Sequence, residues 1–123
     1  MASEIEKIID DMVDTIPRIA ATAVISDKGK VIFQNGKWDV AASASAILKV
    51  VAGASSFNLS GFELQVGERT PNGYIAAGQA GMGYVVINPF AGGVLVTYAL
   101  QNANPHEYLT NFHEFALKIS GKM

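Results

Sequence analysis

The side chains best suited to catalysis or metal binding are the two histidines, His106 and His113. Both fall in a segment with helical periodicity. Their spacing puts the imidazoles on one helix face but about 10 Å apart along the axis, too far to share one metal ion. Zinc-binding histidines on helices are typically four residues apart, and no third ligand motif accompanies this pair. We therefore expect no metal site and no cofactor.

A hydrolytic mechanism is also disfavoured. His113 is next to Glu114, but no serine lies in the glycine-flanked pattern of a nucleophile elbow. The chain contains no cysteine, which removes thiolate nucleophiles, disulfides and sulfur-based metal sites together. These observations predict a protein without catalytic residues, in a reducing cytoplasm.

Two further patterns have simpler explanations than a ligand site. The run Gly78-x-x-Gly81-x-Gly83 reverses the order of the dinucleotide-binding fingerprint, and no predicted helix follows it to hold a phosphate. We interpret it as a hairpin turn. Three aspartates, Asp10, Asp11 and Asp14, lie on the polar side of a predicted helix, where we expect them to be solvated.

Composition narrows the class of protein. The chain has 123 residues, of which 50% are hydrophobic and 16% charged, as expected for one domain spanning residues 1–123 with one core. With 9 Lys+Arg against 11 Asp+Glu and no basic cluster, nucleic acid is not an expected partner. The sequence has neither a signal-peptide pattern nor a membrane-span pattern, so we expect a soluble cytoplasmic protein.

The first two predicted helices have clear boundaries. The first has apolar residues at steps of three and four, namely Ile5, Ile8, Ile9, Met12, Val13 and Ile16. Ser3 and Glu6 form its capping box, and Pro17 ends it. The middle helix follows a cap at Asp39 and stops at Gly53.

A last helix is predicted near the C-terminus. Asn104 is its expected cap, with Pro105 in the first turn and Glu107 at the third position. Its apolar face consists of Leu109, Phe112, Phe115, Ala116 and Ile119.

The rest of the chain is rich in strand formers. Segments 18–26 and 30–34 form a hairpin around the turn Asp27-Lys28-Gly29. Five further strands are expected around residues 57–59, 62–67, 74–78, 83–88 and 94–100. The predicted fold class is α/β (α+β): one antiparallel meander sheet, with the terminal helices on one face and the middle helix on the other.

This order of elements, together with several motifs, resembles profilin, the family that binds actin monomers. The motifs are Ile19-Ala-Ala-Thr-Ala-Val-Ile25, Phe57-Asn-Leu-Ser-Gly-Phe-Glu-Leu-Gln-Val66, Ile75-Ala-Ala-Gly-Gln-Ala-Gly-Met-Gly-Tyr-Val-Val-Ile87, and Val94-Leu-Val-Thr-Tyr98 before Pro105. The resemblance covers nearly the whole chain and is nearest to the divergent archaeal profilins.

The resemblance implies that a surface made from the last helix and the neighbouring strands binds an actin monomer and regulates polymerisation. The candidate actin-binding residues are Glu63, Glu68, Gln79, Tyr84, Asn88, His106, Glu107, Thr110 and His113, of which all but Tyr84 and Asn88 match the family by position. The first three differ in charge from the family. Tyr84 and Asn88 should share one side of their strand with Val86, while Val85 and Ile87 take the other. We expect exposed groups at 88–90, where this strand ends.

Profilins of plants and animals also bind polyproline, through aromatic residues on the first and last helices. This chain has no Phe, Tyr or Trp in residues 1–32 or 116–123. A proline-rich ligand should therefore bind weakly or not at all, although Trp38 and Tyr108 offer another small platform. Phosphoinositide binding stays open, and the expected state is a monomer.

The first half also resembles the roadblock/longin group, through its α-ββ-α order and the phrase Ile16-Pro17…Asp27-x-Gly29. That resemblance implies a homodimeric platform for small GTPases. The group continues with about three strands before its last helix, whereas residues 57–100 have room for five, which favours profilin. A third possibility is an adaptor that uses the same fold for another partner, because a fold does not fix a function.

Overall fold

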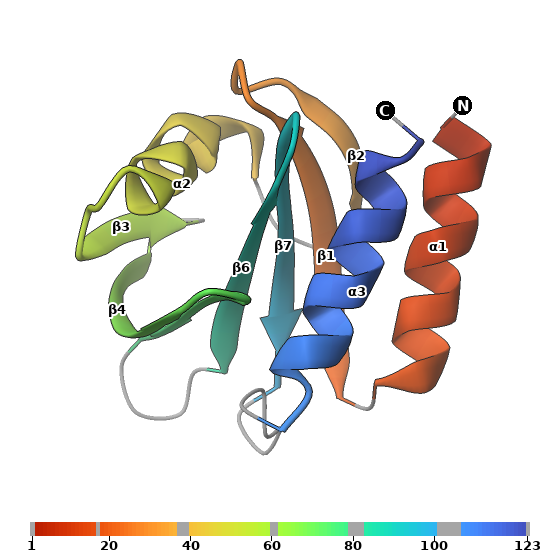
Figure 1. The fold of residues 1–123 in the computed structure, drawn as a ribbon. Coiled ribbons are helices and arrows are strands. Elements are labelled where there is room, and N and C mark those ends of the chain that lie inside the picture. Colours follow the sequence, from red (N-terminus) through yellow and green to blue (C-terminus); the bar gives the residue numbers. More distant parts are fainter. Residues whose placement is uncertain are drawn as a thin grey trace.

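The computed structural model describes residues 2–16, 18–36, 40–59, 62–78, 83–100 and 107–122. In chain order these form α1 (Ala2–Thr15), β1 (Ile19–Ser26), β2 (Val31–Asn35), the 3-10 turn η1 (Ala41–Ser43), α2 (Ala44–Val51), β3 (Ser56–Leu59), β4 (Phe62–Thr70), β5 (Gly73–Ala77), β6 (Tyr84–Phe90), β7 (Gly93–Ala99) and α3 (Leu109–Ser120). Figure 1 shows this order of elements, which is the predicted one.

One sheet contains all the described strands. It is seven-stranded, in the order β2-β1-β7-β6-β5-β4-β3. Every neighbouring pair is antiparallel. The meander from β3 to β7 therefore joins the N-terminal hairpin through the pairing of β7 with β1. The expected antiparallel sheet is confirmed.

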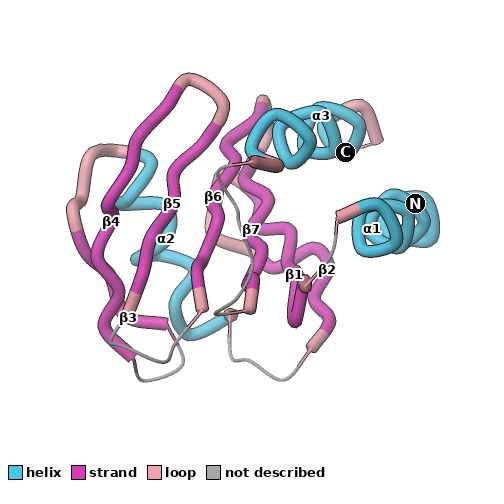
Figure 2. The backbone as a smooth tube through the Cα atoms, turned by 90° about the horizontal axis from the view of Figure 1, so that it is seen from below, coloured by secondary structure: helices cyan, strands magenta, loops and turns pink. Residues whose placement is uncertain are grey.

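Helices cover both faces of this sheet, as predicted. α1 and α3 lie together on one face, and α2 lies on the other (Figures 1 and 2). Alternation along each strand sends side chains to both layers. In β6, Val85 and Ile87 join the apolar cluster under α2, while Val86 joins the cluster under α1 and α3. We refer to these as the α2 cluster and the α1/α3 cluster.

The terminal helices bury most of the apolar stripes that the sequence shows, but Val13 of the predicted first stripe is 38% exposed. Ile9 and Met12 of α1 are fully buried, whereas the three aspartates at 10, 11 and 14 are exposed. The apolar face of α3 is buried as predicted, with Phe112 at its centre. Burial of each such side chain contributes about 1.5–3 kcal/mol, so these two stripes hold the layer in place.

The turn predicted at 27–29 is present. Gly29 has φ +85°, a conformation that residues with a side chain rarely adopt, and its N–H donates to Ser26 O at 3.0 Å. Gly36 closes β2 with φ +87°, and a Cβ added there would collide with Ala21. Glycine is therefore required at both ends of this strand.

The predicted cap of the first helix is wrong, because α1 begins at Ala2 and already contains Ser3. Two further boundary predictions are wrong. The last helix begins at Leu109, so Glu107 lies in the preceding turn and not at the third helical position. The first helical bond there is from the Phe112 N–H to Tyr108 O, at 2.9 Å. The predicted caps Asn104, Pro105 and Asp39, and the stop at Pro17, lie outside the described residues.

The other wrong boundary is in the meander. β6 continues through Pro89, which pairs with Val94, and ends at Phe90. The hairpin to β7 then turns at Ala91-Gly92, where Gly92 has φ +104°. Within the described residues no helix has the length and apolar content needed to span a membrane.

Candidate protein-binding surface

Part of the sheet extends beyond the terminal helices. α3 contacts β6 and β7, and α1 contacts β2. On the same side of the sheet, β3, β4 and the end of β5 lie past α3 (Figure 2), while Ile75 of β5 still packs in the α1/α3 cluster. The side chains on this uncovered area therefore border solvent next to the edge of α3.

Strand register identifies which side chains share this area. Glu68 pairs with Ile75, and Gln65 pairs with Ala77. Directly paired residues of antiparallel strands point to the same side of a sheet. Ile75 belongs to the α1/α3 cluster, so Glu68, Ala77 and Gln65 lie on that side. Glu63, two residues before Gln65, follows by alternation.

Tyr84 joins the same side from β6. It pairs with Ala77 and packs partly against the α1/α3 cluster. The predicted alternation of Tyr84 and Val86 against Val85 and Ile87 is confirmed. A half-buried tyrosine of this kind offers a flat, rigid contact to a partner.

The edge of α3 supplies the remaining side chains. Thr110, His113 and Leu117 follow one another at steps of three and four, so they lie on one side of the helix. Ser120, one turn further, donates from its Oγ to Ala91 O in the β6–β7 turn at 2.9 Å, which places this side toward β6. The opposite side faces α1, since Lys122 Nζ lies 4.0 Å from Glu4 Oε2.

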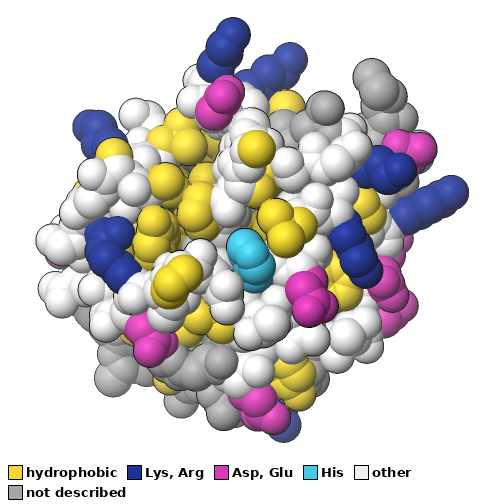
Figure 3. Space-filling view, viewed as in Figure 1, with side chains coloured by type: hydrophobic (Ala, Val, Ile, Leu, Met, Phe, Trp, Pro, Cys, Tyr) yellow, Lys and Arg dark blue, Asp and Glu magenta, His cyan; other side chains and the backbone are white. Residues whose placement is uncertain are grey.

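We call this surface the docking face. Its members are Glu63, Gln65, Glu68, Ala77, Tyr84, Thr110, His113 and Leu117. Leu117 is 53% exposed and adds a large apolar side chain to this face. Figure 3 shows hydrophobic side chains gathered around the middle of this side of the molecule, with charged side chains mostly toward its edges.

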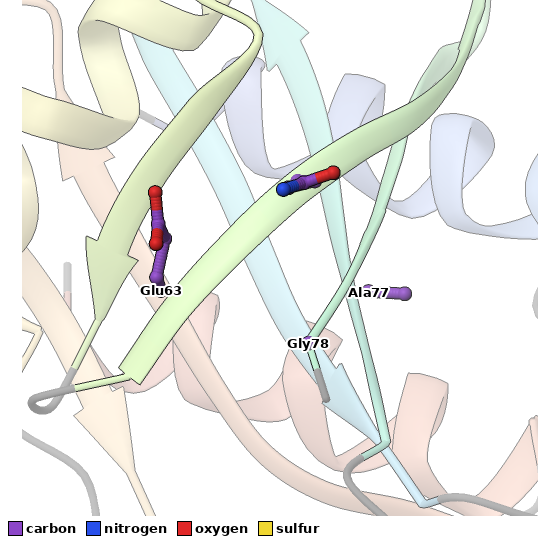
Figure 4. Close-up of a pocket in the computed structure, with 4 residues that line it drawn as sticks. Glu63, Ala77 and Gly78 are labelled. Atoms are coloured by element: carbon purple, nitrogen blue, oxygen red, sulfur yellow. The ribbon is translucent and has the colours of Figure 1, made fainter. Parts of the chain in front are cut away.

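A depression of about 300 Å³ lies on the strand part of the docking face. Its described lining consists of Glu63 and Gln65 from β4, and Ala77 and Gly78 from β5 and its end (Figure 4). The small residues leave the space, and the carboxylate and amide provide hydrogen-bond acceptors at its border. Glu63 has no ion-pair partner among the described side chains, so its charge faces solvent.

The structure brings together five of the residues predicted for the site: Glu63, Glu68, Tyr84, Thr110 and His113. Glu107 is exposed in the turn before α3. Gln79, His106 and the proposed platform residue Trp38 lie outside the described residues.

The prediction for Asn88 is wrong. We expected an exposed amide at the end of β6, but Asn88 is 0% exposed. Its Nδ2 donates to Asn72 O in the β4–β5 turn at 3.0 Å, because β6 runs on past this point alongside that turn. Asn88 therefore ties two hairpins together and is not part of the docking face.

Three members of the face were missed by sequence reasoning, namely Gln65, Ala77 and Leu117. Gln65 carried a usable signal, since it alternates with Glu63 along the same strand. Leu117 carried a weaker one. It falls between the buried positions Ala116 and Ile119, so the sequence pattern alone does not show that it is exposed.

The pair of terminal helices offers no ring platform within the described residues. Phe115 is 6% exposed, and Lys118 Nζ lies 4.9 Å from the centre of its ring. Tyr108 is half-buried against the α1/α3 cluster. The outer sides of α1 and α3 therefore present aliphatic and charged groups.

Comparison with known proteins gives a consistent result. No family model matches the chain. Loki profilin-2 from Lokiarchaeum sp. (strain GC14_75) is 28% identical over 130 residues, covering 97% of each chain. The crystal structure of the LokiProfilin1/rabbit actin complex matches with a TM-score of 0.91 and 28% identity, over 100% of this chain and 98% of that one. The LokiProfilin2/rabbit actin complex matches with a TM-score of 0.91 and 27% identity, over 100% of both.

A seven-stranded antiparallel sheet between two helical layers, open beside the last helix, defines a protein of the profilin fold. Similarity in both sequence and structure extends over essentially the whole chain. In both sequence and structure the chain is similar to divergent, archaeal-type profilins. The five strands from β3 to β7 and the full-length match support this family over the roadblock alternative.

Proposed function

We propose that this protein binds actin monomers through the docking face and so regulates actin polymerisation. The observation that carries the proposal is the TM-score of 0.91, over the whole chain, to Loki profilins solved in complex with rabbit actin. The sequence identity of 28% extends along the same length. A partner bound by those relatives is the first partner to test here.

The docking face has the character of a protein-binding surface. Interfaces between separately folded proteins combine a few apolar or aromatic anchors with a polar border. Leu117 and Tyr84 provide such anchors on either side of the boundary between α3 and the sheet. Glu63, Gln65 and Thr110 provide the polar border. The face therefore suits a broad protein partner.

Acidic side chains give the strand part of the docking face a negative charge. Glu63 and Glu68 both come from β4 and lie on the same side of it. Opposite charges across an interface speed association and favour the correct partner. We propose that basic side chains of actin face this strand, and that the protein acts as a cytoplasmic monomer associated with the cytoskeleton, by binding and without catalysis.

The test measures binding and polymerisation with monomeric rabbit actin. Wild-type protein should slow spontaneous polymerisation and co-purify with actin monomers. Leu117→Asp should weaken binding at least about tenfold, because a charge replaces an apolar anchor. Val13→Asp on α1 is the matched control, since Val13 is also an exposed apolar helix residue, at 38% exposure, but lies away from the face. Wild-type protein without effect at about 100 µM would refute the proposal.

A further inference from the structure

The register of β4 changes within the docking face. Gln65 pairs with Ala77 and Val66 with Ala76, but the next pair is Glu68 with Ile75. Gly67 therefore has no partner on β5 and forms a β-bulge. Bulges bend a strand, increase its twist and redirect the side chains beyond them.

The bulge decides which side of the sheet Glu68 occupies. Val66 packs against the α2 cluster. Strict alternation after Val66 would place Gly67 on the side of α3 and Glu68 on the side of α2. Because Gly67 is an extra residue, Glu68 instead pairs with Ile75 of the α1/α3 cluster and lies on the docking face.

Arg69 is placed on the opposite side by the same shift. It pairs with Tyr74, which packs against the α2 cluster, and its guanidinium carbon lies 5.0 Å from the centre of the Tyr74 ring. Its Nη1 donates to Val50 O at 3.0 Å, and its Nη2 donates to Ala54 O. Val50 is in the last turn of α2 and Ala54 lies just after the helix, so the guanidinium is at the C-terminal end of α2, which favours a cation.

The turn next to Arg69 fixes the other end of the register. Thr70 pairs with Gly73, and its Oγ1 donates to Gly73 O at 2.9 Å. The same Oγ1 accepts the N–H groups of Asn72 at 3.2 Å and Gly73 at 3.1 Å. The extra residue is therefore confined between Val66 and Glu68.

If β4 slipped by one residue into a register without the bulge, Glu68 and Arg69 would each move to the other side of the sheet. Glu68 would then face the carbonyl end of α2, which disfavours an anion, and Arg69 would lose its two carbonyl acceptors. One-residue slips of this kind move a whole set of side chains to the other side of a sheet. The bonds from Arg69 to α2 oppose such a slip.

We propose that Arg69 is a positioning residue for partner binding: by bonding the end of α2 it selects the bulged register and so places Glu68 on the docking face. Arg69 itself lies on the far side of the sheet and need not touch the partner. This inference rests on actin binding through the docking face. It adds that Arg69, which lies outside the docking face, controls the position of Glu68 within it.

The test is a double-mutant cycle on actin affinity with Glu68→Ala, Arg69→Ala and the double variant. Each single change should weaken binding by about threefold or more, and the double variant should be no weaker than Glu68→Ala alone. Arg69→Lys should fall between wild type and Arg69→Ala, because it keeps the charge but not the two-pronged donor. Lys49→Ala, which removes an exposed cation from α2, is the matched control and should bind normally.

Deletion of Gly67 separates positioning from general stabilisation. With Gly67 absent, plain alternation after Val66 already puts Glu68 on the docking face. Adding this deletion to Arg69→Ala should restore binding, even where the melting temperature stays low. Additive losses in the cycle, or an unchanged affinity in Glu68→Ala, would overturn the inference. A wild-type protein that fails to bind actin would instead refute the proposed function.

Discussion

The two sides of β4 differ in what they contact. On one side Leu64 is buried in the α2 cluster and Arg69 bonds the end of α2. On the other side Glu63, Gln65 and Glu68 belong to the docking face. The same strand therefore builds the core with one set of side chains and the docking face with the other. The difference shows that the binding surface is located where helix coverage of the sheet stops.

The largest expected effect is on the buried side. Leu64→Ala should lower the free energy of unfolding by about 2–5 kcal/mol, because Leu64 is 1% exposed and its removal leaves a cavity. Urea denaturation measures this change. The neighbouring variant Gln65→Ala is the control and should stay within about 0.5 kcal/mol of wild type. Equal losses in the two variants would show that the sides of β4 are not distinct.

A smaller effect, on affinity alone, is expected on the open side. Glu63→Lys should weaken actin binding by roughly three- to tenfold, mainly through slower association, and should reduce its dependence on salt. Stopped-flow association at several salt concentrations measures both, with Glu6→Lys on the exposed part of α1 as the control for net charge. Tighter binding by Glu63→Lys would show that the partner is acidic opposite residue 63, which contradicts the proposed basic contact.

Much of this architecture was predictable because it depends on local patterns. The apolar stripes of α1 and α3, the turn at Gly29 and the alternation of Val85, Val86 and Ile87 are each visible within a few residues. The order of elements also predicted which helices cover which face of the sheet. Local chemistry and long-range packing agree at these positions, as they do in sequences that specify one fold.

The features that escaped prediction depend on contacts distant in sequence. Asn88 is buried because its amide meets Asn72 in another hairpin, which no local pattern reveals. The side of the sheet on which Glu68 lies depends on the bulge at Gly67, between the pairs Val66–Ala76 and Glu68–Ile75. Strict alternation from Val66 predicts the opposite side. Leu117 is exposed although it falls between the buried positions Ala116 and Ile119. Coverage and register are properties of the assembled sheet.

The smallest effect is expected at the outer sides of α1 and α3. A ten-proline peptide should bind there weakly or not at all, because aliphatic and charged groups replace rings whose contacts contribute about 0.5–1.5 kcal/mol each. Heteronuclear chemical shifts during a titration give the affinity. Saturable shifts on both helices below about 100 µM would show that these helices do form a proline-binding site.

Hydrogen exchange with and without monomeric rabbit actin tests the docking face most directly. Amides of the described parts of β4, β5 and α3 should exchange more slowly in the complex, while those of α1 and α2 should be unchanged. The Leu117→Asp variant should show no slowing at the same actin concentration. Slower exchange confined to α1 and α2, with β4 and α3 unchanged, would contradict the location of the binding surface.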